Sequence, residues 1–185
     1  MRAPASPFEN PSYFDAIKKD LISTNSGNLI FVHSIARALM KDGVDVDFNK
    51  ANKLWDEEDI KRINSEYDAF IIPLANAFRS SFKQQMVIMT ENVKKLNIPC
   101  VIVGVGYQGD IDGAFDGDPA LDKVVKGFVK AVLSKSGKIG LRGEVTAGYL
   151  EHLGFKAEKD FTVIGCPSMY LYGSALPKPK QVDIS

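Results

Sequence analysis

Four short apolar runs, each followed by turn residues, constrain the fold of this chain more than any other feature. They are Tyr67–Pro73, Cys100–Gly104, Ile139–Leu141 and Phe161–Gly165. Continuous apolar runs of this length are typical of strands that are covered on both faces, and no hairpin turn joins any two of them. Strands that alternate with helices favour a parallel sheet, so the runs predict an α/β domain.

A fifth strand is predicted at Val44–Phe48, where apolar and acidic residues alternate. Helices are predicted between the strands from apolar residues that recur at helical spacing. They cover Tyr13 to Ile22, Leu29 to Leu39, Asp56 to Ser65, residues 80–96, a segment that begins at Asp118-Pro119, and a segment that follows Gly143. We therefore expect a Rossmann-like parallel sheet of about five strands, with helices on both faces and right-handed crossovers.

Composition divides the chain into three parts. Residues 1–12 are rich in Pro, Ser and Asn and are predicted to form a flexible arm. Residues 13–176 are long enough for one domain with a single hydrophobic core. Residues 177–185 begin with alternating proline and lysine and end in a short apolar alternation, so we expect a linker towards a second domain that this sequence lacks.

The charge balance argues against several classes of partner. The chain has 23 Lys and Arg residues and 23 Asp and Glu residues, and no basic run is interleaved with aromatic residues, so we expect no nucleic-acid partner. Cys100 and Cys166 lack the spacing of a metal site or of a disulfide framework. Nowhere do about 18 apolar residues run together. We expect a cytoplasmic chain with no metal and no membrane span.

Candidate binding residues follow the predicted strands, because ligands of open parallel sheets bind beyond the carboxyl ends of the strands. Gly104-Val105-Gly106 lacks the third glycine of a dinucleotide-binding fingerprint. The candidates at the strand ends are Asn76, Gly106, Tyr107, Arg142, Gly143 and Ser168.

Arg142 is the candidate with the clearest chemistry, because it ends one predicted strand and precedes a predicted helix. The first N–H groups of a helix have no partner within the helix and attract anions, and an arginine beside them adds a charged, bidentate donor. The local pattern alone leaves a second reading open, in which Arg142 pairs with a neighbouring acid such as Glu144 or Asp160.

Four segments together resemble the polysaccharide pyruvyl transferase family. They are Asn25-Ser26-Gly27-Asn28-Leu29, Tyr67 to Pro73 with Asn76 beyond it, Ile98 to Gly106, and Gly140-Leu141-Arg142-Gly143-Glu144-Val145-Thr146 followed by Val163 to Ser168. Members are similar to two-domain B-type glycosyltransferases, so the resemblance implies that this chain is one Rossmann-like half of such a fold.

The resemblance also implies a reaction. Family members transfer the carboxyvinyl or pyruvate group of phosphoenolpyruvate to a sugar hydroxyl in the synthesis of exopolysaccharide, capsule or cell-wall polymers. The implied partners are phosphoenolpyruvate and a saccharide acceptor, free or lipid-linked, and no cofactor is implied. Arg142 would hold the phosphate or carboxylate of the donor, and the turn Asn25 to Asn28 would face the cleft. The general acid and further donor residues would come from the second domain, so the chain alone would be inactive.

Two other functions remain open at this point. One is a glycosyltransferase-like enzyme of the same architecture that uses a nucleotide-sugar donor, and the other is a non-catalytic Rossmann-like binding module.

Overall fold

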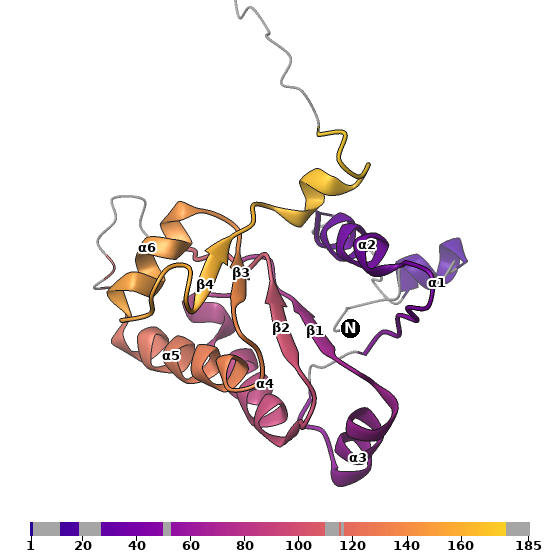
Figure 1. Cartoon of the computed structure of the whole chain (residues 1–185), viewed down its shortest axis with the longest axis horizontal. Helices are drawn as coiled ribbons and strands as arrows, with labels where there is room; N and C mark the ends of the chain where they lie inside the picture. Colours follow the sequence, from indigo (N-terminus) through magenta and orange to yellow (C-terminus); the bar gives the residue numbers. More distant parts are fainter. Residues whose placement is uncertain (2–11, 19–26, 50–52, 110–114, 116, 177–185) are drawn as a thin grey trace, which may run out of the picture.

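Two pairs of short parallel strands form the centre of the molecule (Figure 1). The computed structural model describes Met1 and residues 12–18, 27–49, 53–109, 115 and 117–176. Strand β1 (Phe70–Pro73) pairs with β2 (Cys100–Val103), and β3 (Ile139–Leu141) pairs with β4 (Phe161–Val163). Each of the four predicted apolar runs therefore contains a strand, and the parallel direction expected from the alternation of strands and helices is confirmed.

The two pairs are linked just beyond the end of β2. The N–H groups of Gly104 and Val105 donate to the carbonyl of Gly140 at 2.9 and 3.2 Å, and the N–H of Arg142 donates to the carbonyl of Val105 at 2.8 Å. Val105 and Leu141 form an isolated parallel bridge. Through these bonds the two two-stranded sheets lie side by side in the order β1, β2, β3, β4, and the hydrogen bonds between the inner two are made by residues just beyond the end of β2.

Helices precede or follow each strand. The helices are α1 (Tyr13–Lys18), α2 (Gly27–Leu39), α3 (Glu57–Glu66), α4 (Lys83–Lys95), α5 (Pro119–Leu133) and α6 (Glu144–His152), and short 3₁₀ turns are η1 (Ser80–Phe82) and η2 (Pro167–Tyr170). Two of the starts follow the capping rules. The Asp56 carboxylate accepts from the N–H of Asp59 at α3, and the Asp118 carboxylate accepts from the N–H of Leu121 at α5.

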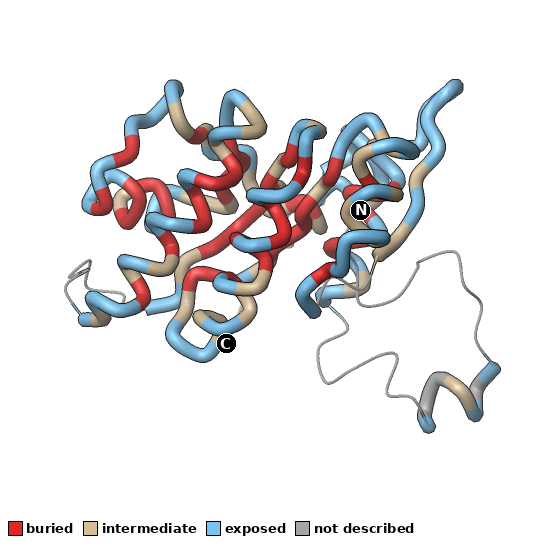
Figure 2. The backbone as a smooth tube through the Cα atoms, turned by 90° about the horizontal axis from the view of Figure 1, so that it is seen from below, coloured by how far each residue is buried: buried red, intermediate tan, exposed pale blue. Residues whose placement is uncertain are grey.

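The strands bury alternate side chains on two different faces. Phe70 and Ile72 belong to the larger hydrophobic core, which also contains the apolar faces of α4, α5 and α6. Ile71 and Val103 point the other way and pack against a smaller cluster centred on Phe31 and its neighbours in α2. Figure 2 shows buried residues along the strands and along the helix faces that meet them. Alternation along a strand is what divides the core in this way.

The predicted fifth strand is wrong. Residues 44–48 carry no strand assignment, and a cavity of about 530 Å³ lined by Val44–Asp47 and by Glu66–Ala69 lies between this segment and β1. The polar groups of Asp47 find other partners: its carbonyl accepts from the amino group of Met1 at 2.5 Å, and its carboxylate accepts from the Tyr67 hydroxyl at 2.5 Å. These contacts hold the segment beside the sheet without a ladder.

Most of the predicted arm (1–12) and the whole predicted linker (177–185) lie outside the described residues, so both stay predictions. The same holds for the carboxyl end of the predicted first helix, since α1 is described only to Lys18. None of the helices in the described part of the chain is long and apolar enough to cross a membrane.

Tyr149 in α6 connects this helix to α5 through a partly buried hydrogen bond. Its hydroxyl donates to the carboxylate of Asp122 at 2.7 Å, and its ring stacks on Tyr107 with the centroids 4.1 Å apart. Burial, with the nearby Asp122 carboxylate, raises the pKa of Tyr149 well above its usual value. The neutral phenol is therefore part of the folded state.

This bond predicts a loss of stability at alkaline pH. Because the folded-state pKa of Tyr149 exceeds the unfolded value of about 10, its contribution is fully present below about pH 10 and is lost as the pH rises towards the folded-state pKa. Tyr149→Phe should lower the free energy of unfolding by about 1.5–3 kcal/mol near pH 7, the worth of a hydrogen bond to a charged group, and should flatten the alkaline decline. Urea titrations between pH 7 and 11 measure both effects.

The matched control is Tyr172→Phe, since the Tyr172 side chain is 71% exposed. It should leave both the stability and its pH dependence unchanged. An equally steep alkaline decline in wild type and in Tyr149→Phe would contradict the role given to the Tyr149 hydroxyl.

Candidate functional site

Three chain segments that follow β1, β2 and β3 meet at one edge of the molecule. Asn76 follows β1, Gly106 follows β2 and Arg142 follows β3. Nη1 of Arg142 donates to Oδ1 of Asn76 at 2.6 Å, a bond between residues 66 positions apart in the sequence. Parallel strands present their carboxyl ends at the same edge, which is why residues so distant in sequence come together.

Gly106 allows this close approach. Its N–H donates to the carbonyl of Ala75 at 2.6 Å. A Cβ at this position would lie 3.1 Å from that carbonyl oxygen, 3.4 Å from Oδ1 of Asn76 and 3.7 Å from Cδ of Arg142. A Cβ here would press on the Ala75 carbonyl and touch Asn76 and Arg142 at ordinary van der Waals distance, so glycine eases the close approach of the two backbone segments beside the Asn76–Arg142 pair.

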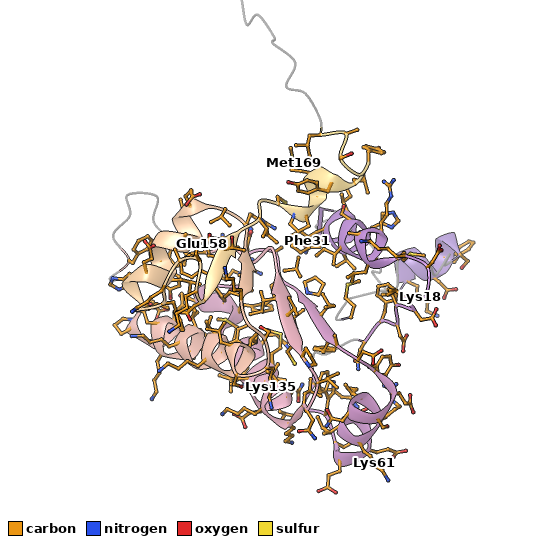
Figure 3. The ribbon with its side chains drawn as sticks, viewed as in Figure 1. Lys18, Phe31, Lys61, Lys135, Glu158 and Met169 are labelled. Atoms are coloured by element: carbon orange, nitrogen blue, oxygen red, sulfur yellow. The ribbon has the colours of Figure 1, made fainter. Side chains whose placement is uncertain are left out.

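Helix α2 forms the neighbouring wall of the site. The guanidinium carbon of Arg142 lies 5.2 Å from the centre of the Phe31 ring, within the range of a cation–π interaction. Figure 3 shows Phe31 on α2, near the segment that leads to Met169 in η2. Gly104 adopts a positive φ of 71° beneath this contact, and a Cβ there would lie 2.6 Å from Cδ of Pro167 and 2.8 Å from Cζ of Phe31.

Arg142 carries a positive charge that the described residues do not balance. None of the ion pairs between described residues involves Arg142. Asp160 instead accepts the backbone N–H of Lys156, and Glu144 is exposed. The Nε–H of Arg142 is buried and lacks a hydrogen-bond partner in the described part of the chain. The bond of Arg142 to the neutral amide of Asn76 orients the guanidinium and leaves its charge available to an anion.

Helix α6 begins two residues after Arg142, at Glu144. Gly143 is its N-cap residue and supplies no side-chain cap, while the Gly143 carbonyl accepts from the N–H groups of Thr146 and Ala147 at 3.1 and 3.2 Å. The arrangement expected from the sequence, an arginine at a strand end beside the amino end of a helix, is present. An anion here would meet the guanidinium and the positive end of the helix dipole together.

Tyr107 lies on a different side of its loop from Gly106. Its N–H donates to the Thr146 hydroxyl oxygen at 3.0 Å, and its ring stacks on Tyr149 and meets Phe115 edge-on at 5.6 Å. The ring belongs to the aromatic cluster that borders the core, so the contacts of the described residues give Tyr107 a role in anchoring the loop to α6 rather than in contacting the Asn76–Arg142 pair.

The remaining predicted site residues fall into two groups. Gly27 and Asn28 are exposed at the start of α2, and Ser168 is half-buried in η2 next to Pro167. Asn25 and Ser26 lie outside the described residues. The structure therefore brings Asn76, Gly106, Arg142 and Gly143 together, and it joins α2 to this group through Phe31.

Phe31 and Thr146 are contributors that sequence reasoning missed. Phe31 lies within the predicted helix Leu29 to Leu39 but was not among the candidate site residues. The spacing from Phe31 to Ile35, i to i+4 beside Val32 and Ala36, would have placed it on the buried face. Thr146 offers no such signal, because a hydroxyl that accepts from a distant backbone N–H leaves no periodic pattern.

Comparison with known proteins gives one match. The family model described as polysaccharide pyruvyl transferase matches residues 25–184, which is most of the chain. No curated protein and no solved structure matches the chain significantly.

The contact beneath Arg142 predicts a large difference between two glycine substitutions. Gly104 and Gly43 both have positive φ, 71° and 78°, but a Cβ at Gly43 would have no atom within 4 Å. Gly43→Ala should therefore cost only the left-handed backbone strain, about 1–2 kcal/mol. Gly104→Ala adds the overlap with Pro167 and Phe31, about 1–3 kcal/mol more. Urea unfolding of the two variants measures the difference, and equal losses would show that α2 and the Pro167 turn are not held against Gly104.

Proposed function

Because the chain belongs to the polysaccharide pyruvyl transferase family, we propose that it binds phosphoenolpyruvate at the edge formed by Asn76, Gly106 and Arg142 and transfers its carboxyvinyl or pyruvate group to a sugar. The single observation that supports this most is the charge of Arg142, which is oriented by Asn76 and faces no carboxylate among the described residues. An oriented arginine next to a helix start is suited to a phosphate or carboxylate.

The reaction that we propose requires positive charge around a departing phosphate. Protonation of the methylene carbon of phosphoenolpyruvate makes the adjacent carbon electrophilic, and one sugar hydroxyl adds to it. A second hydroxyl of the same sugar then displaces the phosphate and closes a pyruvate ketal. One hydroxyl proton replaces the proton given by the general acid, and the other leaves with the phosphate. Charge that grows on the phosphate oxygens is stabilised by preorganised donors.

Within this mechanism, Arg142 is the proposed catalytic residue and Asn76 the residue that positions it. The aromatic face of Phe31 restrains the guanidinium from the other side at 5.2 Å. Gly27 and Asn28 at the exposed start of α2, with Asn25 and Ser26 before them, are the proposed acceptor-side residues, and Ser168 would lie beyond the same edge. We place the general acid in a second domain of the B-type glycosyltransferase arrangement, which would close over this edge.

The acceptor in this proposal is a saccharide of an exopolysaccharide, capsule or cell-wall polymer, free or lipid-linked, and the reaction needs no cofactor. The test is to incubate the enzyme, with the proposed second domain present, with phosphoenolpyruvate and a panel of saccharides, and to measure inorganic phosphate release and pyruvylated product by mass spectrometry. Turnover with a nucleotide sugar in place of phosphoenolpyruvate would overturn the proposal in favour of glycosyl transfer.

Substitution of Arg142 tests the donor role. Arg142→Ala removes a charge-assisted hydrogen bond, and Arg142→Lys keeps the charge but loses the planar pair of donors. A loss of about 1.5–3 kcal/mol corresponds to a roughly ten- to a hundredfold drop in phosphoenolpyruvate affinity or in kcat/KM. We expect the larger loss for alanine, with lysine between alanine and wild type. Calorimetric titration with phosphoenolpyruvate and steady-state kinetics measure these effects.

Lys126→Ala serves as the charge-matched control, since Lys126 is exposed on α5. It should leave donor affinity unchanged. The thermal unfolding temperature of each variant is measured alongside its kinetics. An Arg142→Ala enzyme that unfolds at a lower temperature but keeps the normal dependence on donor concentration when folded would show that the arginine is structural.

A further inference from the structure

A second arginine, Arg79, lies at the same edge of the molecule, in the segment that follows β1. Its Nη1 donates to Oε1 of Gln108 at 3.4 Å, and its guanidinium carbon lies 5.8 Å from the centre of the Phe82 ring. Its Nε–H is buried and, like that of Arg142, has no hydrogen-bond partner among the described residues. Arg79 is therefore held from two sides by a neutral amide and an aromatic ring, which is also how Asn76 and Phe31 hold Arg142.

The backbone places these two arginines on one side of the same ladder. The segments that carry Phe78 and Tyr107 run parallel: Phe78 N–H donates to the Gly106 carbonyl at 3.2 Å, and Gln108 N–H donates to the Phe78 carbonyl at 3.0 Å. Side chains alternate along such a segment. Since Tyr107 turns towards α6, Gly106 and Gln108 face the opposite side.

That side is the one on which Arg142 lies, because a Cβ on Gly106 would point at Asn76 and Arg142. Gln108, two residues further along, holds Arg79. A step of two residues in an extended segment is about 6.6 Å. The backbone positions that face the two arginines, Gly106 and Gln108, are thus offset along the edge by about the length of a small molecule with an anionic group at each end.

The charge of Arg79 is not neutralised within the described part of the chain. Lys83, the next cation along the sequence, forms an ion pair with Asp118 at 3.0 Å, and the Ser80 hydroxyl donates to the same carboxylate at 2.5 Å. None of the ion pairs between described residues involves Arg79. A partly buried guanidinium with an unsatisfied N–H gains free energy when an anion binds it.

We propose that Arg79 is a second anion-binding residue of the donor site, so that Arg142 and Arg79 bind the two anionic groups of phosphoenolpyruvate, one its phosphate and the other its carboxylate. Gln108 and Phe82 position Arg79. This inference rests on the proposed function for the identity of the ligand, but the pairing of the two arginines rests on their own contacts. It accounts for selection of a donor with two anionic groups over a donor with one.

The experiment compares four anions on matched variants. Phosphoenolpyruvate, inorganic phosphate, pyruvate and a nucleoside diphosphate are titrated by calorimetry into the wild-type protein, Arg79→Met, Arg142→Met and the control Lys126→Met. Methionine removes the charge while keeping an unbranched side chain. We expect Arg79→Met to weaken phosphoenolpyruvate binding by roughly ten- to a hundredfold, as for Arg142→Met, and Lys126→Met to have no effect.

Inorganic phosphate and pyruvate each carry one of the two anionic groups of phosphoenolpyruvate, so their binding shows which arginine binds which group. If each arginine binds one end, phosphate should be weakened mainly by one substitution and pyruvate mainly by the other. Gln108→Leu, which removes the amide that orients Arg79, should weaken the same anion as Arg79→Met, by a smaller factor. Thermal unfolding of each variant, with phosphoenolpyruvate titrated only into variants that remain folded, separates ligand binding from loss of structure.

The outcomes separate this inference from the proposed function. Phosphoenolpyruvate binding that depends on Arg142 and is unchanged in Arg79→Met and Gln108→Leu overturns the role of Arg79 and leaves the proposed function standing. Binding of a nucleoside diphosphate but not of phosphoenolpyruvate, with a loss in Arg79→Met, supports the second anion site and overturns pyruvyl transfer. A wild-type protein that binds none of these anions overturns both.

Discussion

The segment that follows β2 forms backbone hydrogen bonds to the segments on both sides of it, and the arrangement of the site depends on these bonds. On one side, the Gly106 N–H donates to Ala75; on the other, Gly104 and Val105 donate to Gly140, and Arg142 donates back to Val105. These bonds continue the parallel ladders for only a few residues past the strands, yet they fix three loops in register. The side chains of Asn76 and Arg142 can then meet at 2.6 Å without either loop being stabilised separately. The sheet thus fixes the relative positions of the loops that follow its strands.

The two arginines of this edge are held differently from several cations elsewhere on the surface. Lys94 pairs with Glu91, and Lys138 pairs with Glu158. At the edge, both arginines are oriented by neutral amides and aromatic rings, which restrict the guanidinium plane but leave its charge uncompensated. Exposed ion pairs contribute little to stability, so their absence costs the fold little.

Sequence patterns predicted the four strands and most helices because burial imposes a period that local residues must obey. Asp118-Pro119 marked the start of α5, and Phe70–Pro73 and Cys100–Val103 were found as apolar runs. The prediction of a strand at Val44–Phe48 was wrong, because alternating apolar residues indicate the two faces of a strand but not whether a neighbouring strand is near enough to pair with it. In this fold a cavity lies between that segment and β1. Arg142 could be placed by its position between strand and helix, whereas its partners Asn76 and Phe31 come from chain segments that only the fold brings together.

The large sequence separation between Asn76 and Arg142 has a consequence for folding. The contacts that join the segments after β1, β2 and β3 are non-local, and parallel pairing already requires the chain to cross the domain between strands. Closing such distant contacts is slow, because loop entropy is lost before the contacts form. On the ribosome, the edge formed by Asn76, Gly106 and Arg142 therefore cannot assemble until the segment after β3 has emerged.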